Sequence, residues 1–138
     1  MGNVTGGCLC GTVRYSSNAD PVMTFVCHCA HCQKHSGSAF LVFVAVPRDT
    51  LQIRGDTLGT YNDIGDSGQP VYRKFCGECG SPILMDAQAM PDLLFINAGT
   101  LDETDFLNPQ THVWCEQRQQ WVKLDDDVQR FDRNPPTG

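Results

Sequence analysis

Short apolar segments recur along this 138-residue chain, and glycine, proline, asparagine and aspartate separate them. Segments of this length that are rich in β-branched and aromatic residues are typical of β-strands. The longest apolar run, residues 39–46, lacks polar alternation and therefore predicts a central strand buried on both faces. Helical periodicity is weak, and only residues 32–38 and 87–90 are expected to form a turn or two. The pattern predicts a mainly β fold with strands near residues 12–15, 39–46, 51–54, 58–61, 71–75, 82–85, 93–97, 112–115 and 121–124.

Length and composition favour one folded domain. A chain of this size, with 41% hydrophobic residues, buries enough surface for a core of its own. We expect residues 1–131 to form a single domain and residues 132–138, which contain two prolines and a glycine, to form a flexible C-terminal tail. Neither a secretory signal nor an apolar run of about 20 residues is visible. These features predict a cytoplasmic protein with no membrane partner, in which disulfides are not expected.

The charge balance limits the possible partners. Ten basic and sixteen acidic residues give a formal net charge of −6, which argues against nucleic acid as a partner. The charges are unevenly spread, because residues 27–38 contain no acid but do contain Lys34, and Arg73 lies in a second basic stretch. A small anionic ligand could bind near these cations, although each of them could instead be a solvated surface charge. The sequence leaves the oligomeric state open.

The eight cysteines are arranged in clusters, and two of these clusters contain the spacing C-x-x-C. A tight turn with this spacing directs two sulfurs at one ion, and Gly80 is suited to the left-handed residue that such a turn requires. Without an oxidising compartment, metal binding explains the clusters better than disulfides do. The sequence therefore predicts zinc, with seven ligands: Cys8, Cys10, Cys27, Cys29, Cys32, Cys76 and Cys79.

Spacing alone allows two divisions of these seven thiols. In the first, Cys29 and Cys32 join Cys76 and Cys79 in a ribbon. In the second, Cys8 and Cys10 join Cys76 and Cys79, and a local trio of Cys27, Cys29 and Cys32 remains. A trio would leave one zinc position open, which distinguishes catalytic from structural sites.

Three motifs resemble those of the glutathione-dependent formaldehyde-activating enzyme family. Residues 7–15 (GCLCGTVRY) are similar to its G-x-C-x-C-G-x-V-x-Y opening, residues 27–32 (CHCAHC) to its C-H-C-x-x-C segment, and residues 75–81 (FCGECGS) to its third motif. The resemblance continues through residues 99–102 and reaches Pro109, His112 and Trp121, so that it covers nearly the whole chain.

The resemblance implies an Mss4-like β-sheet fold organised around two zinc ions, and it implies the second division of ligands. The Cys8/Cys10/Cys76/Cys79 site would be structural, and the Cys27/Cys29/Cys32 site would be catalytic. The implied reaction joins glutathione, the co-substrate, to formaldehyde, and enzymes of this reaction are classed as carbon–sulfur lyases. The partners would then be a small-molecule thiol and an aldehyde, with Lys34 and Arg73 as candidate contacts to the glutathione carboxylates.

The chemistry also needs a proton donor for the alkoxide formed from the aldehyde, and His28, His31 or His35 could serve. His28 lies between two ligands, where it could instead be exposed or bonded to a local carbonyl group. Trp114 and Trp121 are expected to fill the core, and Cys115 to behave as a small hydrophobe on a strand.

Two other functions are compatible with these residues. The chain could be a zinc-stabilised binding module whose two metal sites are both structural, with His28, His31 or Cys115 as the fourth ligand of the trio. It could also be a thiol redox switch at Cys29 and Cys32.

Overall fold

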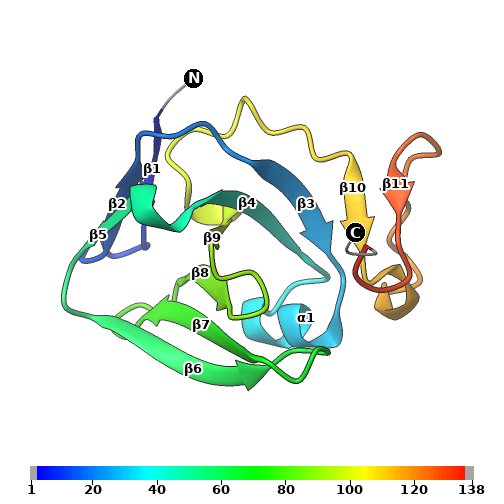
Figure 1. The fold of residues 1–138 in the computed structure, drawn as a ribbon, viewed down its shortest axis with the longest axis horizontal. Coiled ribbons are helices and arrows are strands. Elements are labelled where there is room, and N and C mark those ends of the chain that lie inside the picture. The colour runs from blue at the N-terminus through cyan, green and yellow to red at the C-terminus, as the bar shows by residue number, and fades with distance from the viewer. Residues whose placement is uncertain (1–2, 136–138) are drawn as a thin grey trace. The chain divides into compact units, whose positions relative to one another are not determined.

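The computed structural model describes residues 3–135, and β-strands dominate it (Figure 1). The mainly β fold is therefore confirmed. No helix in the described part of the chain is long and apolar enough to cross a membrane. The strands are β1 (Val4–Gly7), β2 (Arg14–Ser17), β3 (Met23–Cys27), β4 (Leu41–Pro47), β5 (Leu51–Arg54), β6 (Leu58–Ile64), β7 (Pro70–Cys76), β8 (Pro82–Ala87), β9 (Leu93–Asn97), β10 (Thr111–Val113) and β11 (Gln129–Arg130). The helices are α1 (Ala30–Ser36) and the short 3-10 helices η1 (Arg48–Thr50), η2 (Ala98–Thr100) and η3 (Cys115–Gln117).

The described residues divide into two compact units. The first holds the residues up to Met23 together with Val44–Phe106, and the second holds Thr24–Phe43 together with the residues from Leu107 onward. The single domain expected for residues 1–131 stays a prediction. Residues 136–138 of the expected tail lie outside the described residues.

A small antiparallel sheet of β1, β2 and β5 opens the first unit. Gly6 on β1 pairs with Tyr15 on β2, and the Tyr15 hydroxyl forms a 2.7 Å hydrogen bond with the Thr100 hydroxyl. A Cβ atom on Gly6 would lie 2.3 Å from the Tyr15 hydroxyl oxygen, so the aromatic ring requires a glycine at this position.

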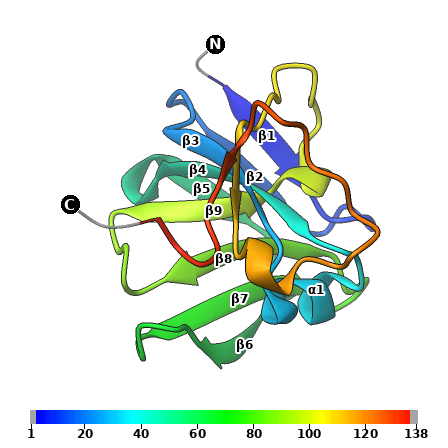
Figure 2. The same ribbon diagram turned by 90° about the vertical axis from the view of Figure 1, so that its right-hand side faces the viewer.

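The second sheet of this unit contains β9, β8, β7 and β6, which follow one another as neighbours (Figure 2). The pairs β6–β7, β7–β8 and β8–β9 are antiparallel. The register of β7 against β8 shifts between Lys74 and Phe75, immediately before Cys76. The part of β4 in this unit includes residues 44–46, which are fully buried, and this confirms that part of the buried strand predicted for residues 39–46.

In the second unit, β10 runs parallel to both β3 and β11. Val113 on β10 pairs with Cys27 at the end of β3. Helix α1 follows after two residues, and it ends at Gly37, whose φ of 69° is the left-handed conformation that favours glycine. The sequence therefore turns directly from strand to helix within the segment that carries three cysteines.

Four expectations are wrong, two about elements and two about single residues. Residues 121–124 form a turn and coil instead of a strand, and residues 87–90 form the end of β8 and a turn instead of a helix. Trp121 does not fill the core, because 67% of its surface is exposed. Cys115 is half-buried at the start of η3 and not on a strand.

Candidate metal centres

Four cysteines from two loops of the first unit meet at one point. Cys8 and Cys10 lie in the turn that follows β1, Cys76 ends β7, and Cys79 lies in the turn before β8. Their four sulfur atoms all lie within 4.8 Å of one another. The Sγ atoms of Cys8 and Cys10 are 3.6 Å apart, and those of Cys10 and Cys76 are 3.8 Å apart.

These distances fit a tetrahedral metal site. Zinc–sulfur bonds of about 2.3 Å place the corners of a tetrahedron about 3.8 Å from one another. A disulfide would need about 2.05 Å, and no disulfide joins the eight cysteines, all of which lie in the described part of the chain. The donor set and its spacing therefore fit one zinc-like cation.

Hydrogen-bond donors surround these sulfur atoms. The Thr12 and Thr57 hydroxyl oxygens lie 3.5 and 3.3 Å from the Cys76 sulfur, and their hydrogen bonds with it lower the pKa of Cys76 to about 5. The Ser81 hydroxyl, 3.2 Å from the Cys79 sulfur, lowers the pKa of Cys79 to about 7. Such bonds stabilise the thiolate form, which is the form that binds a metal.

Each loop also contains the glycine that its sharp turn requires. Gly80, directly after Cys79, has a φ of 80°, as predicted, and its N–H donates to the Cys76 carbonyl group at 2.8 Å. Gly11, directly after Cys10, has a φ of 84°. Both lie in the left-handed region, where other residues are strained.

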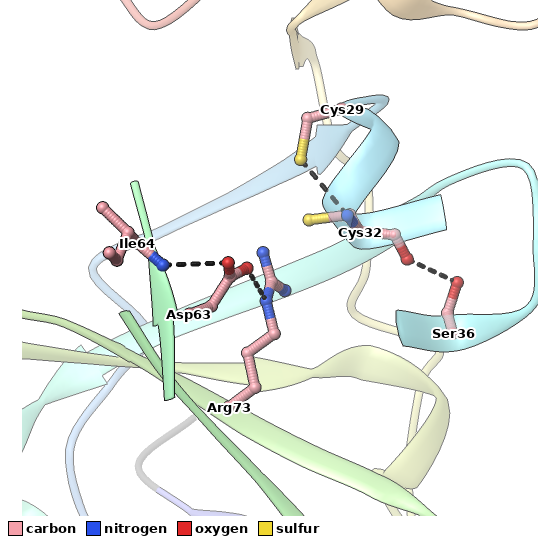
Figure 3. Close-up of polar contacts among 6 residues, drawn as sticks. All are labelled: Cys29, Cys32, Ser36, Asp63, Ile64 and Arg73. Atoms are coloured by element: carbon pink, nitrogen blue, oxygen red, sulfur yellow. Dashed lines mark hydrogen bonds and ion pairs between the residues drawn. The ribbon is translucent and has the colours of Figure 1, made fainter. Parts of the chain in front are cut away.

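The second cluster lies at the junction of β3 and α1 in the second unit. Cys27 ends β3, Cys29 caps the helix and Cys32 lies in its first turn, and their sulfur atoms lie within 4.8 Å of one another. The Cys32 N–H donates to the Cys29 sulfur at 3.3 Å (Figure 3). The nearby thiols of Cys29 and Cys32 and the burial of the site raise the pKa of Cys27. A divalent cation would relieve this repulsion between thiolates, so the trio also fits a metal ion.

The structure thus groups the seven thiols according to the second division, with four in one cluster and three in the other. Among the described residues of the second unit, no fourth His, Cys, Asp or Glu atom joins the trio. His31 is exposed, and the Cys115 thiol points to the His112 carbonyl group at 3.6 Å. Within this unit the trio therefore has three protein donors.

His28 is not exposed, contrary to one of the two expectations, because its exposed fraction is 0%. Its ring stacks on that of His112, with Nε2 of His28 2.9 Å from Nδ1 of His112. Burial, with smaller effects of His112 and Arg118, lowers the pKa of His28 to about 4, so the ring is neutral at pH 7. Its Nδ1 atom has no hydrogen-bond partner among the described residues.

The backbone of His28 is held on both sides. Its N–H donates to the Val113 carbonyl group at 3.1 Å, and the Gln33 side chain donates to its carbonyl group at 2.7 Å. The peptide that links Cys27 to Cys29 is therefore fixed by β10 and by α1.

The two candidate contacts for glutathione have different surroundings. Lys34 is exposed on α1 and lines a hollow of about 400 Å³. Arg73 is buried, with 5% of its surface exposed, and its Nε donates to Asp63 Oδ2 at 3.0 Å (Figure 3). The alternative that Arg73 is a solvated surface charge is therefore wrong.

Sequence reasoning did not single out the glutamines around the trio. Gln33, Gln117 and Gln119 hydrogen-bond one another and the backbone near the cysteines. Gln117 and Gln119 lie 84 and 86 residues from Gln33 in sequence, and no spacing rule connects a glutamine to a distant cysteine.

The fold and the two clusters define a mainly β protein whose cysteine clusters could bind metal ions. The sequence matches the family described as glutathione-dependent formaldehyde-activating enzyme over residues 3–117, and the chain belongs to this family. The match supports a glutathione-related function in formaldehyde activation, and the fold is consistent with the Mss4-like fold that the motifs predict.

A crystal structure of a Rhodobacter sphaeroides protein has a similar fold. The two chains are 20% identical, the similarity covers 76% of this chain and 91% of that one, and the TM-score is 0.57. At this identity the likeness shows the fold alone.

Proposed function

We propose that the protein is a zinc-dependent enzyme of the carbon–sulfur lyase type that forms S-(hydroxymethyl)glutathione from glutathione and formaldehyde. In this reaction the thiol sulfur forms a bond with the aldehyde carbon, the carbonyl π bond breaks, and the thiol proton ends on the new hydroxyl oxygen. No electron is gained or lost, so no redox cofactor is needed. We also propose that the protein is located in the cytoplasm, where reducing conditions keep the ligand thiols reduced.

One observation carries the proposal: the Cys27, Cys29 and Cys32 sulfur atoms lie within 4.8 Å of one another, and no fourth donor from the described residues of the same unit joins them. The chemistry that zinc supplies in such a site is a lowered pKa for a thiol at its open position. The family match identifies glutathione as the thiol to test first.

The residues around the trio support this site by holding it in place. Cys32 is buried in the first turn of α1, and Cys29 accepts its N–H at the helix start. We assign a positioning role to His28, because its ring faces His112 and its backbone is bonded on both sides. We assign the role of proton donor for the aldehyde oxygen to His31, which is exposed within the trio's own turn.

The Cys8, Cys10, Cys76 and Cys79 cluster would hold a second, structural zinc ion. Four thiols complete a tetrahedral site and leave no position for a substrate. Its role would be to join the loop after β1 to the β7–β8 turn.

The alternative function is a zinc-stabilised binding module without catalysis. It is favoured if the ion at the trio gains a fourth protein ligand and exchanges no ligand with solution. A thiol redox switch is less well supported, because the trio's thiols are explained as ligands.

The test is the rate of S-(hydroxymethyl)glutathione formation, measured by exchange NMR with the zinc-loaded protein. We expect Cys29→Ser to abolish the acceleration, because it removes one ligand of the trio. Cys115→Ser is the matched control, since Cys115 lies outside both clusters, and it should leave the rate unchanged. Equal rates with and without the wild-type protein, at two bound zinc ions per chain, would favour the binding module.

A further inference from the structure

Strand β6 forms the outer edge of the larger sheet in the first unit. Its only neighbour among the described strands is β7, and the pairing runs without a shift from Leu58 opposite Cys76 to Ile64 opposite Pro70 (Figure 2). The strand contains no proline, no lysine and no bulge, which are features that keep an edge strand from pairing with another chain. The edge of β6 is therefore open to a further strand.

The backbone groups at this edge belong to the even-numbered residues of β6. At one end of the ladder the Gly77 N–H donates to the Thr57 carbonyl group at 2.7 Å, and at the other the Gly65 N–H donates to the Gln69 carbonyl group at 2.9 Å. Hydrogen-bonded pairs alternate along an antiparallel ladder, so the odd-numbered residues between these two pairs bond to β7. The even-numbered residues direct their N–H and C=O groups away from β7: Leu58, Thr60, Asn62 and Ile64.

Two copies of β6 can pair with each other through these groups. An antiparallel pair with a two-fold axis at Tyr61 places Thr60 of one copy opposite Asn62 of the second copy, and Leu58 opposite Ile64 of the second copy. All seven residues of β6 then have a partner, whereas moving the axis by one residue would leave two of the seven unpaired. The strand therefore favours one register with itself.

The side chains of β6 are compatible with this register. Tyr61 and Ile64 are each more than half exposed, so both have apolar surface left to bury. The one charged residue of the strand, Asp63, is paired with Arg73 and would lie opposite Gly59 of the second copy. No two like charges therefore face each other across the pair, where they would be destabilising.

The local charge also permits a second copy to approach. The net charge of −6 makes two molecules repel each other in general. Strands β6 and β7 together carry Asp63, Arg73 and Lys74, which gives 2 − 1 = +1 at this edge. Lys74 Nζ donates to the Thr60 hydroxyl at 2.9 Å, so in the self-paired register this cation lies next to Asn62 of the second copy.

We propose that the protein forms a homodimer in which two β6 strands pair antiparallel around Tyr61 and join the sheets of two first units into one continuous sheet. The partner that the edge fits is thus a second copy of this chain. The inference is independent of the proposed function, because none of the paired residues belongs to either cysteine cluster.

The test is sedimentation velocity of the zinc-loaded full chain from about 1 to 100 µM, where we expect a monomer–dimer equilibrium. Asn62→Pro should weaken the dimer about tenfold or more, because it removes an outward N–H and breaks no bond to β7. The matched control is Ile53→Ser, which removes an exposed apolar side chain from β5, an edge strand of the small sheet. It should leave the dimer unchanged.

Two charge variants of Asn62 test the register without a change to the backbone. Asn62→Lys should weaken the dimer about tenfold, because the new cation would lie beside Lys74 of the second copy. Asn62→Asp should strengthen it about threefold at low salt, and this gain should fade as the salt concentration rises. Asn62 is exposed, so both variants should melt like the wild type.

The outcomes decide both the interface and its occupant. A wild-type protein that stays monomeric throughout this range overturns the proposal and leaves the edge of β6 to a strand of another protein. A dimer that is as stable in Asn62→Pro and Asn62→Lys as in the wild type lies elsewhere on the molecule and also overturns it. If the two charge variants change the dimer in the same direction, the register around Tyr61 is wrong.

Discussion

At the scale of single residues, burial decides what a charged side chain does. Arg73 was a candidate contact for a glutathione carboxylate, yet it lies in the middle of β7 with a side chain that is 6% exposed. Its partner Asp63, on the neighbouring strand β6, is 10% exposed and also accepts the N–H of Ile64. A charge pair this deeply buried is costly to break, because the remaining partner keeps its charge without compensation.

We therefore predict that Arg73→Met lowers the free energy of unfolding by about 3–5 kcal/mol, measured by urea denaturation of the zinc-loaded protein. The double variant Arg73→Met/Asp63→Leu should recover much of this loss, since no buried charge then remains. Arg54→Met is the control, because Arg54 is exposed on β5. If Arg73→Met instead unfolds like the wild type and fails to bind glutathione, Arg73 is a ligand contact.

The burial of His28 and the exposure of Trp121 are properties that the sequence did not predict. The spacing C-H-C makes the positions of the thiols predictable, but the burial of His28 depends on His112, which is 84 residues away in sequence. The exposure of Trp121 depends on its hydrogen bond to Gln119 and on a turn where a strand was expected. The outcome for His28 follows from a tertiary contact, and the Gln119 side chain that bonds Trp121 is itself bonded to Gln33, 86 residues away, so a local pattern contains neither arrangement.

At the scale of elements, several strands with strong apolar or β-branched patterns were predictable, although β3 was not. Residues 51–54 and 93–97 match β5 and β9, and the apolar run at residues 39–46 matches β4. Strand β1 was missed because two of its four residues are glycines, which disfavour strands. It forms because β2 pairs with it and because Tyr15 packs on Gly6.

This packing gives a prediction for β1. Gly6→Ala should lower the free energy of unfolding by about 2–3 kcal/mol, because the new methyl group would lie 2.3 Å from the Thr100 carbonyl oxygen and the Tyr15 hydroxyl. Gly99→Ala is the matched control. Nothing lies within 4 Å of its Cβ position, and it should be neutral or stabilise by about 0.5 kcal/mol. Equal stabilities of the two variants in thermal melts would mean that β1 moves to accept the methyl group.

At the scale of the whole molecule, the sequence identified which cysteines could bind metal ions. It did not show how these cysteines divide between the two sites. C-x-x-C and C-x-C spacings identified seven thiols, and the resemblance to a family, not the spacing, selected the grouping that the structure has. Cys10 and Cys76 are separated by 66 residues, so only the folded chain shows that their sulfur atoms lie 3.8 Å apart.

The two clusters should contribute differently to folding. Cys76 is completely buried and joins loops that are far apart in sequence, whereas Cys27, Cys29 and Cys32 lie within one short segment. A metal that closes a long loop removes more entropy from the unfolded chain than one that closes a short loop. Structural zinc contributes on the order of 10 kcal/mol in small zinc domains.

We therefore predict that Cys76→Ser abolishes cooperative unfolding and loses zinc from the first cluster. Cys29→Ser should stay folded with one zinc ion per chain, and Cys115→Ser should keep two zinc ions and the wild-type melting curve. Elemental analysis and circular dichroism melts of the three variants measure both quantities. If Cys29→Ser also fails to fold, both clusters are structural and the binding module becomes the better description. If Cys76→Ser melts like the wild type, the four-cysteine cluster does not hold the first unit together, and the division of roles between the clusters is wrong.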